Sequence, residues 1–190
     1  TIGREMVEAM KGRATGRPLR FTVGVADVLP KLVFADFLMG IGQSDRAMDV
    51  YQMLAAEDAT KLIGRKRLAN IYLTRKELDK VSSIVEEILK IDSKDADGLL
   101  LRGQLLLMKK NTPEAVKALE ASLKAKPSSA QAHYLLGLAQ ANSGNLQRGE
   151  AELTMALRLD GTLTQAYLAL AEMKQNSGDS QTAASLARQA

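Results

Sequence analysis

The chain has 190 residues, of which 46% are hydrophobic and 4% aromatic, with neither Trp nor Cys, and its formal net charge is +4. This length suffices for one or two packed domains or for one repeat array. The lack of Cys excludes disulfides and thiol catalysis but leaves the compartment open. Basic and acidic residues are dispersed, so we expect no nucleic-acid partner. No apolar run reaches the roughly 18 residues of a membrane span.

Residues 1–27 lack the regular pattern of the rest of the chain. They contain Gly12, Gly16, Pro18 and Gly24, and such residues disfavour a continuous helix. We interpret 1–27 as an N-terminal extension, with a degenerate preceding repeat as the alternative.

From residue 28 onward, small residues recur every 34 positions, at Ala35, Ala69, Gly103, Gly137 and Ala171. Between them, apolar residues recur at helical spacing, as in Leu146, Leu153 and Leu157. The pattern predicts pairs of helices whose backbones approach closely at the small residues.

This pattern resembles the tetratricopeptide repeat, a helix–turn–helix unit of 34 residues. Leu136-Gly137, Gly149, Leu153 and Ala156 match the family motif, and Pro127 stands where the family has its end-of-repeat proline. With this phase, repeats begin at Val28, Leu62, Ala96, Ala130 and Thr164. The array then spans 28–190 with a truncated last repeat. The chain opens on Thr1 and stops inside a repeat, so we interpret it as a fragment of a larger bacterial array protein.

Each repeat is expected to hold an A helix followed by a B helix. The predicted A helices are Val28–Ile41, Leu62–Arg75, Ala96–Lys109, Ala130–Asn142 and Thr164–Asn176. The predicted B helices are Asp45–Glu57, Leu78–Ile91, Pro113–Ala125, Leu146–Leu159 and Ser180 to the end. Gly42, Gly144 and Gly178 follow A helices where a left-handed cap residue is expected.

The resemblance implies an all-α fold, a right-handed superhelical solenoid of antiparallel helix pairs. It also implies a non-enzymatic protein–protein interaction scaffold that binds a peptide or helix in its concave groove. The expected setting is a bacterial envelope or secretion assembly. The alternative is a regulatory or substrate-docking region of an enzyme whose catalytic domain lies outside this chain. The localisation stays open between cytoplasm and periplasm.

Positions of the A helices that line the groove in similar proteins give the candidate binding site. Its apolar members would bury ligand side chains, and its amides would bond the ligand backbone. Lys66, with Arg67 beside it, would favour an acidic segment at one end. The predicted site residues are Lys66, Asn70, Leu100, Gln104, Leu107, Tyr134, Leu138 and Asn142.

The sequence gives little indication of catalysis or of metal or cofactor binding. The single histidine, His133, is interpreted as a packed structural residue, because a metal site needs several ligands. No nucleophile–base pair or phosphate loop is present, so no catalytic residue, metal or cofactor is expected. The C-terminal stretch with Ala184, Leu186 and Ala187 is apolar, which predicts end-to-end self-association through the truncated last repeat.

Overall fold

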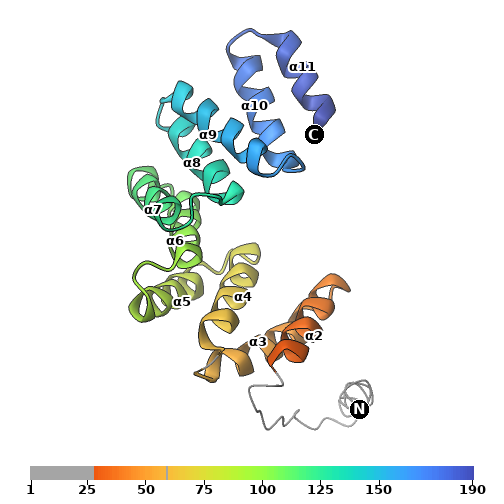
Figure 1. The fold of residues 1–190 in the computed structure, drawn as a ribbon, viewed down its shortest axis with the longest axis vertical. Helices are drawn as coiled ribbons and strands as arrows, with labels where there is room; N and C mark the ends of the chain where they lie inside the picture. The colour runs from red at the N-terminus through yellow and green to blue at the C-terminus, as the bar shows by residue number, and fades with distance from the viewer. Residues whose placement is uncertain (1–27, 59) are drawn as a thin grey trace. The chain divides into compact units, whose positions relative to one another are not determined.

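A computed structural model of the chain describes residues 28–58 and 60–190. The interpretation of residues 1–27 therefore lies outside the described residues. The chain divides into two compact units, with the boundary between Ile71 and Tyr72. Figure 1 shows helices and short connections throughout the described part, and no strand is assigned there. The predicted all-α helical repeat array is confirmed.

The helices alternate between A and B helices in chain order. The A helices are α2 (Val28–Gly40), α4 (Lys61–Thr74), α6 (Ala96–Met108), α8 (Ala130–Asn142) and α10 (Thr164–Asn176). The B helices are α3 (Ser44–Ala56), α5 (Leu78–Ile91), α7 (Thr112–Ala125), α9 (Leu146–Leu159) and α11 (Ser180–Gln189). Every observed helix begins and ends within one residue of its predicted bounds.

Each A helix ends in a left-handed turn at the same place in the 34-residue period. The positive φ angles are 76° at Gly42, 58° at Lys76, 58° at Lys110, 83° at Gly144 and 87° at Gly178. The three glycines confirm the predicted caps, and lysine occupies the other two positions. In each turn the following amide donates to the carbonyl five residues earlier, as from Asn145 to Gln140 at 2.9 Å. This is the Schellman pattern of helix termination.

In the second unit the helix pairs stack in chain order. Helix α6 packs on α7, α8 on α9, and α10 on α11, and the pairs join through α7 against α8 and α9 against α10 (Figure 1). Helix α6 also contacts α8 directly. Direct contact between A helices is expected where they form the inner row of a curved stack.

Glycine sets the closest approach between paired helices. A Cβ atom on Gly137 of α8 would lie 2.7 Å from Leu153 Cγ and 3.0 Å from the Gly149 carbonyl oxygen on α9. A Cβ atom on Gly103 of α6 would lie 2.5 Å from Leu119 Cγ on α7. These distances are shorter than normal carbon contacts, so the recurring small residue is a packing requirement.

The first unit uses the same construction. Ala35 of α2 and Ala47 of α3 are both fully buried where these helices pack together. Gly64 of α4 lies against the backbone of α3, where its Cβ atom would be 2.6 Å from the Tyr51 carbonyl oxygen. Lys31 is buried and its Nζ lies 3.9 Å from Glu57 Oε1, which compensates the buried charge in part.

Candidate functional site

The predicted site residues all lie on A helices, but they belong to both compact units. Lys66 and Asn70 are on α4 within the first unit. The second unit holds the other six, on α6 and α8, namely Leu100, Gln104, Leu107, Tyr134, Leu138 and Asn142. Since α6 and α8 contact each other, the structure brings these six onto neighbouring helices.

Three predicted anchors also take part in packing between successive pairs. Leu100, Leu107 and Tyr134 pack against a buried cluster of Leu119, Leu135, Leu136 and Ala139. Tyr134 packs in addition against the next cluster, which includes Leu153 and Leu170. Burial raises the pKa of the Tyr134 phenol above its ordinary value. Each of the three side chains therefore has only part of its surface available to a ligand.

The remaining members in the second unit are not part of these clusters. Leu138 and Gln104 are half-buried, and Asn142 at the end of α8 is exposed. An amide side chain both donates and accepts hydrogen bonds, so it can pair with either group of a peptide backbone. We call the part of α6 and α8 that carries Gln104, Leu138 and Asn142 the α6–α8 face.

In the first unit, Asp36 of α2 joins three helices. The Tyr51 hydroxyl on α3 donates to Asp36 Oδ1 at 2.5 Å, and Arg67 Nη2 on α4 donates to Asp36 Oδ2 at 3.1 Å. Burial, and then the bond to Asp36, raise the pKa of Tyr51 well above its ordinary value. The charge of Arg67 is therefore partly compensated by Asp36. Sequence reasoning missed this network, since no short-range motif joins residues 36, 51 and 67.

His133 is the packed structural residue that the sequence predicted. Its Nδ1 lies 2.6 Å from Glu152 Oε2 on α9, and its Nε2 lies 3.0 Å from the Pro127 carbonyl oxygen. The side chain is 15% exposed. Among residues 28–58 and 60–190, no group of three or more potential metal ligands is found.

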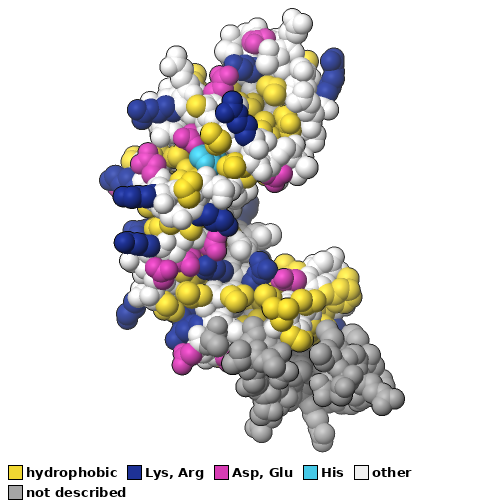
Figure 2. Space-filling model, in the orientation of Figure 1, with side chains coloured by type: hydrophobic (Ala, Val, Ile, Leu, Met, Phe, Trp, Pro, Cys, Tyr) yellow, Lys and Arg dark blue, Asp and Glu magenta, His cyan; other side chains and the backbone are white. Residues whose placement is uncertain are grey.

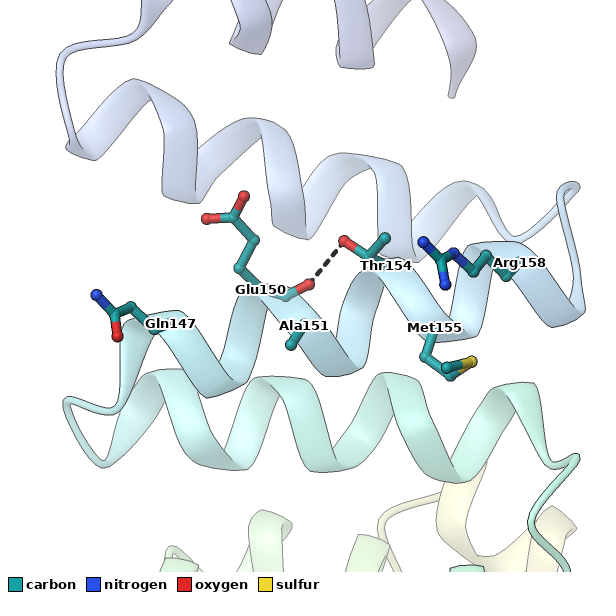
Figure 3. Close-up of a pocket in the computed structure, with 6 residues that line it drawn as sticks. All are labelled: Gln147, Glu150, Ala151, Thr154, Met155 and Arg158. Carbon is teal, nitrogen blue, oxygen red and sulfur yellow. Dashed lines mark hydrogen bonds between the residues drawn. The ribbon is translucent and has the colours of Figure 1, made fainter.

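A shallow hollow lies along α9, the B helix of the fourth repeat. Figure 3 shows that it is formed along a single helix, and its volume is about 510 Å³. The short side chain of Ala151, between the longer Gln147 and Met155 one turn away on either side, leaves this space. Glu150 at the rim is paired with Lys174 Nζ at 2.6 Å. Sequence reasoning did not predict the hollow.

Charge is mixed over the surface of the second unit. Figure 2 shows basic and acidic side chains interspersed on the drawn face of that unit. Exposed pairs such as Lys117 with Glu114, at 2.9 Å, follow the helical three-residue spacing. No helix in the described part of the chain is long and apolar enough to span a membrane.

Stacked pairs of antiparallel helices with a 34-residue period define a helical repeat protein. Residues 100–163 match the family model of the tetratricopeptide repeat. This stretch begins within α6 and ends just after α9, and over it the resemblance drawn from the sequence is confirmed.

Solved structures extend the same fold over most of the chain. TTC0263, a thermophilic TPR protein of Thermus thermophilus, is 20% identical, with 83% of this chain and 87% of that chain covered and a TM-score of 0.72. MamA of Desulfovibrio magneticus RS-1 is 22% identical, with 87% and 93% covered and a TM-score of 0.64. YrrB, described as a TPR protein with an unusual peptide-binding site, is 16% identical, with 86% and 84% covered and a TM-score of 0.57. Comparison with curated protein sequences gave no match.

Proposed function

We propose that this protein is a non-enzymatic scaffold that binds a partner peptide or helix along its A helices. The observation that carries the proposal is the α6–α8 face, where half-buried Leu138 and Gln104 and exposed Asn142 lie on helices in direct contact. An apolar contact provides burial energy of about 25 cal/mol per Å² removed from water, and the amides bond the peptide backbone.

The ligand would combine apolar side chains with accessible backbone groups. Leu100, Leu107 and Tyr134 would present their remaining exposed surface to it. In the first unit, taken by itself, Lys66 and Asn70 on α4 would suit an acidic or carboxylate-bearing segment. The charge of neighbouring Arg67 would contribute less, because Asp36 already compensates it in part. Binding should then depend only weakly on salt.

The similarity to a TPR protein with a peptide-binding site supports peptide recognition. Two of the similar structures come from the bacteria T. thermophilus and D. magneticus, which supports a bacterial setting. The scaffold would act within a bacterial envelope or secretion assembly.

Peptides selected from a random library against the full chain provide a defined ligand for the test. Leu138→Ala and Gln104→Ala should each weaken binding, measured by isothermal titration calorimetry, by about 1 kcal/mol or more. Glu120→Ala, on the exposed side of α7, is the matched control and should bind like the parent. Melting curves must show that all variants remain folded. If Glu120→Ala weakens binding and both A-helix variants are neutral, the proposed face is wrong.

Tyr134→Ala is less suitable as the diagnostic variant. Tyr134 packs against two buried clusters, so its removal would also leave cavities between helix pairs. A loss of binding in that variant would not separate ligand contact from damage to the array.

A further inference from the structure

The hollow along α9 has the lining that a packed helix requires. Residues at i, i+3, i+4 and i+7 of one helix surround the hole into which a facing helix inserts a side chain. The hollow is formed by two overlapping sets of this kind, one that begins at Gln147 and one that begins at Ala151 (Figure 3). Together the two sets comprise Gln147, Glu150, Ala151, Thr154, Met155 and Arg158. We call them the α9 holes.

The residues that open this hollow are not explained by packing within the array. Ala151 is small, but it is exposed and lies outside the helix-pair contacts. The equivalent position on α7 is Lys117, which is also exposed and pairs with Glu114 at 2.9 Å. A long side chain is therefore tolerated at this position of the repeat, and the short one on α9 leaves space that the fold does not require.

Apolar side chains are exposed at both ends of the α9 holes. Leu146, Met155 and Leu159 are 58%, 38% and 41% exposed. Leu146 lies one turn before Glu150, and Leu159 lies one turn after Met155, so they extend the same side of the helix. A partner that covers this side would remove apolar surface from water, which is the main driving force for most protein association.

The charge at one end of the hollow is positive. Glu150 is the acid among the lining residues, and Lys174 compensates it at 2.6 Å. Among the described residues, no ion pair is found for exposed Arg158. On α7 the equivalent Lys124 has a glutamate four residues before it, where α9 has a threonine. The α9 surface is thus complementary to an acidic partner in a way that the outer side of α7 is not.

An extended peptide would find few partners here for its backbone. Gln147 is the one amide in the lining, and the Thr154 hydroxyl already donates to the Glu150 carbonyl oxygen at 2.8 Å. The α6–α8 face differs, because it presents the amides of Gln104 and Asn142. A helical partner satisfies its own backbone groups and presents apolar side chains every three or four residues, so it suits the α9 holes.

We propose that α9 is a second interaction surface, which binds an amphipathic helix of a partner protein with acidic side chains beside its apolar stripe. Two apolar side chains, three or four residues apart, enter the two holes. An acidic side chain pairs with Arg158, whose guanidinium can form two parallel bonds with a carboxylate. The surface belongs to a B helix, so its occupation does not require peptide binding on the α6–α8 face.

Helical peptides of designed sequence test the proposal on the full chain. The first has about 14 residues, held helical by a side-chain lactam, with leucines three and four residues apart and glutamates on both flanks. The second has lysines in place of these glutamates. The third has the acidic sequence with a central proline and no lactam. Titrated into ¹⁵N-labelled protein, the acidic helix should shift the amides of Gln147, Ala151 and Arg158, and it should bind at least tenfold more tightly than the other two.

Two variants connect this binding to the α9 holes. Ala151→Gln places a longer neutral side chain in both holes and should weaken binding of the acidic helix at least tenfold. Arg158→Glu should reverse the preference, so that the lysine peptide binds more tightly than the glutamate peptide. Lys124→Glu, at the equivalent exposed position of α7, is the matched control and should bind like the parent. Melting curves establish that each variant is folded.

The remaining outcomes overturn the proposal. Equal binding of the acidic and lysine helices would show a purely apolar contact, and undiminished binding of the proline peptide would show an extended ligand. An equal loss in Lys124→Glu and Arg158→Glu would show that the attraction is not local to the hollow. Amide shifts on α6 and α8 without shifts on α9, or no shifts at millimolar peptide, would show that the α9 holes are not a binding site.

Discussion

At the scale of single residues, two lysines occupy turn positions whose left-handed backbone conformation favours glycine. Lys76 and Lys110 have φ angles of 58°, at the positions held by glycine in the first, fourth and fifth repeats. A side chain with a Cβ atom is disfavoured in the left-handed region by roughly 1 kcal/mol. These turns persist because the two helices on either side fix their backbone.

Replacing Lys110 by glycine should therefore stabilise the protein. Part of the relieved strain is offset by the greater freedom of glycine in the unfolded chain, so we expect a gain of about 0.5–1 kcal/mol. Urea unfolding followed by circular dichroism measures it. Lys109→Gly is the matched control: Lys109 has a φ of −80°, so glycine there should lower stability. Equal effects at both positions would contradict the argument.

The contact between Gly137 and Gly149 leaves no space for a methyl group. Gly137→Ala places a Cβ atom 2.7 Å from Leu153 Cγ and 3.0 Å from a backbone carbonyl, which forces α8 and α9 apart. We expect a loss of about 1–3 kcal/mol in the free energy of unfolding. Gly40→Ala, where a Cβ atom meets nothing within 4 Å, should be neutral or stabilising by up to about 1 kcal/mol. An unchanged melting temperature for Gly137→Ala would show that the helices are less close than described.

At the scale of elements, polar contacts connect helices that are also packed through small residues. His133 of α8 reaches Glu152 of α9 and the carbonyl of Pro127, which lies in the turn after α7. Ser122 of α7 donates to the Ala96 carbonyl at the start of α6, at 2.7 Å. Such bonds fix the relative position of neighbouring helices more narrowly than apolar packing does.

A double-mutant cycle should detect coupling between His133 and Glu152. His133→Ala and Glu152→Ala should each lower the free energy of unfolding by about 1–2 kcal/mol, because each leaves a partly buried partner without its bond. The double variant should lose less than the sum of the two, by about 0.5–1 kcal/mol. Urea unfolding of the four proteins at one pH provides the values. Strictly additive losses would mean that the 2.6 Å contact contributes nothing.

At the scale of the whole molecule, the 34-residue period explains why much of the fold could be predicted. Small residues such as Gly103 and Gly137 mark the close approach of helix pairs, and Gly42, Gly144 and Gly178 mark the ends of A helices. A structural requirement that recurs in each repeat produces a periodic pattern of residues, which can be recognised in a single sequence. Lys76 and Lys110 adopt the same turn although they are not glycines, because tertiary packing overrides the preference of lysine for negative φ angles.

The candidate site was less predictable than the fold. The period identified which A-helix positions are equivalent in the repeats. It did not show how much of each side chain is buried by packing, as for Tyr134, which packs against two clusters. The bond from Tyr51 to Asp36 and the hollow beside Ala151 depend on contacts or side-chain sizes that have no periodic signature. Contacts between residues far apart in the sequence depend on how the chain folds, and they cannot be inferred from a single sequence.

Mapping a bound peptide on the protein tests the central claim most directly. A library-selected peptide is titrated into ¹⁵N-labelled protein, and the shifts of backbone amides are followed by nuclear magnetic resonance. We predict that the largest changes fall on α6 and α8, around Gln104, Leu138 and Asn142, with small changes on the exposed sides of α7 and α9. Changes concentrated along α9 at Gln147, Ala151 and Met155, with α6 and α8 unaffected, would contradict the assignment of the A-helix face as the binding surface.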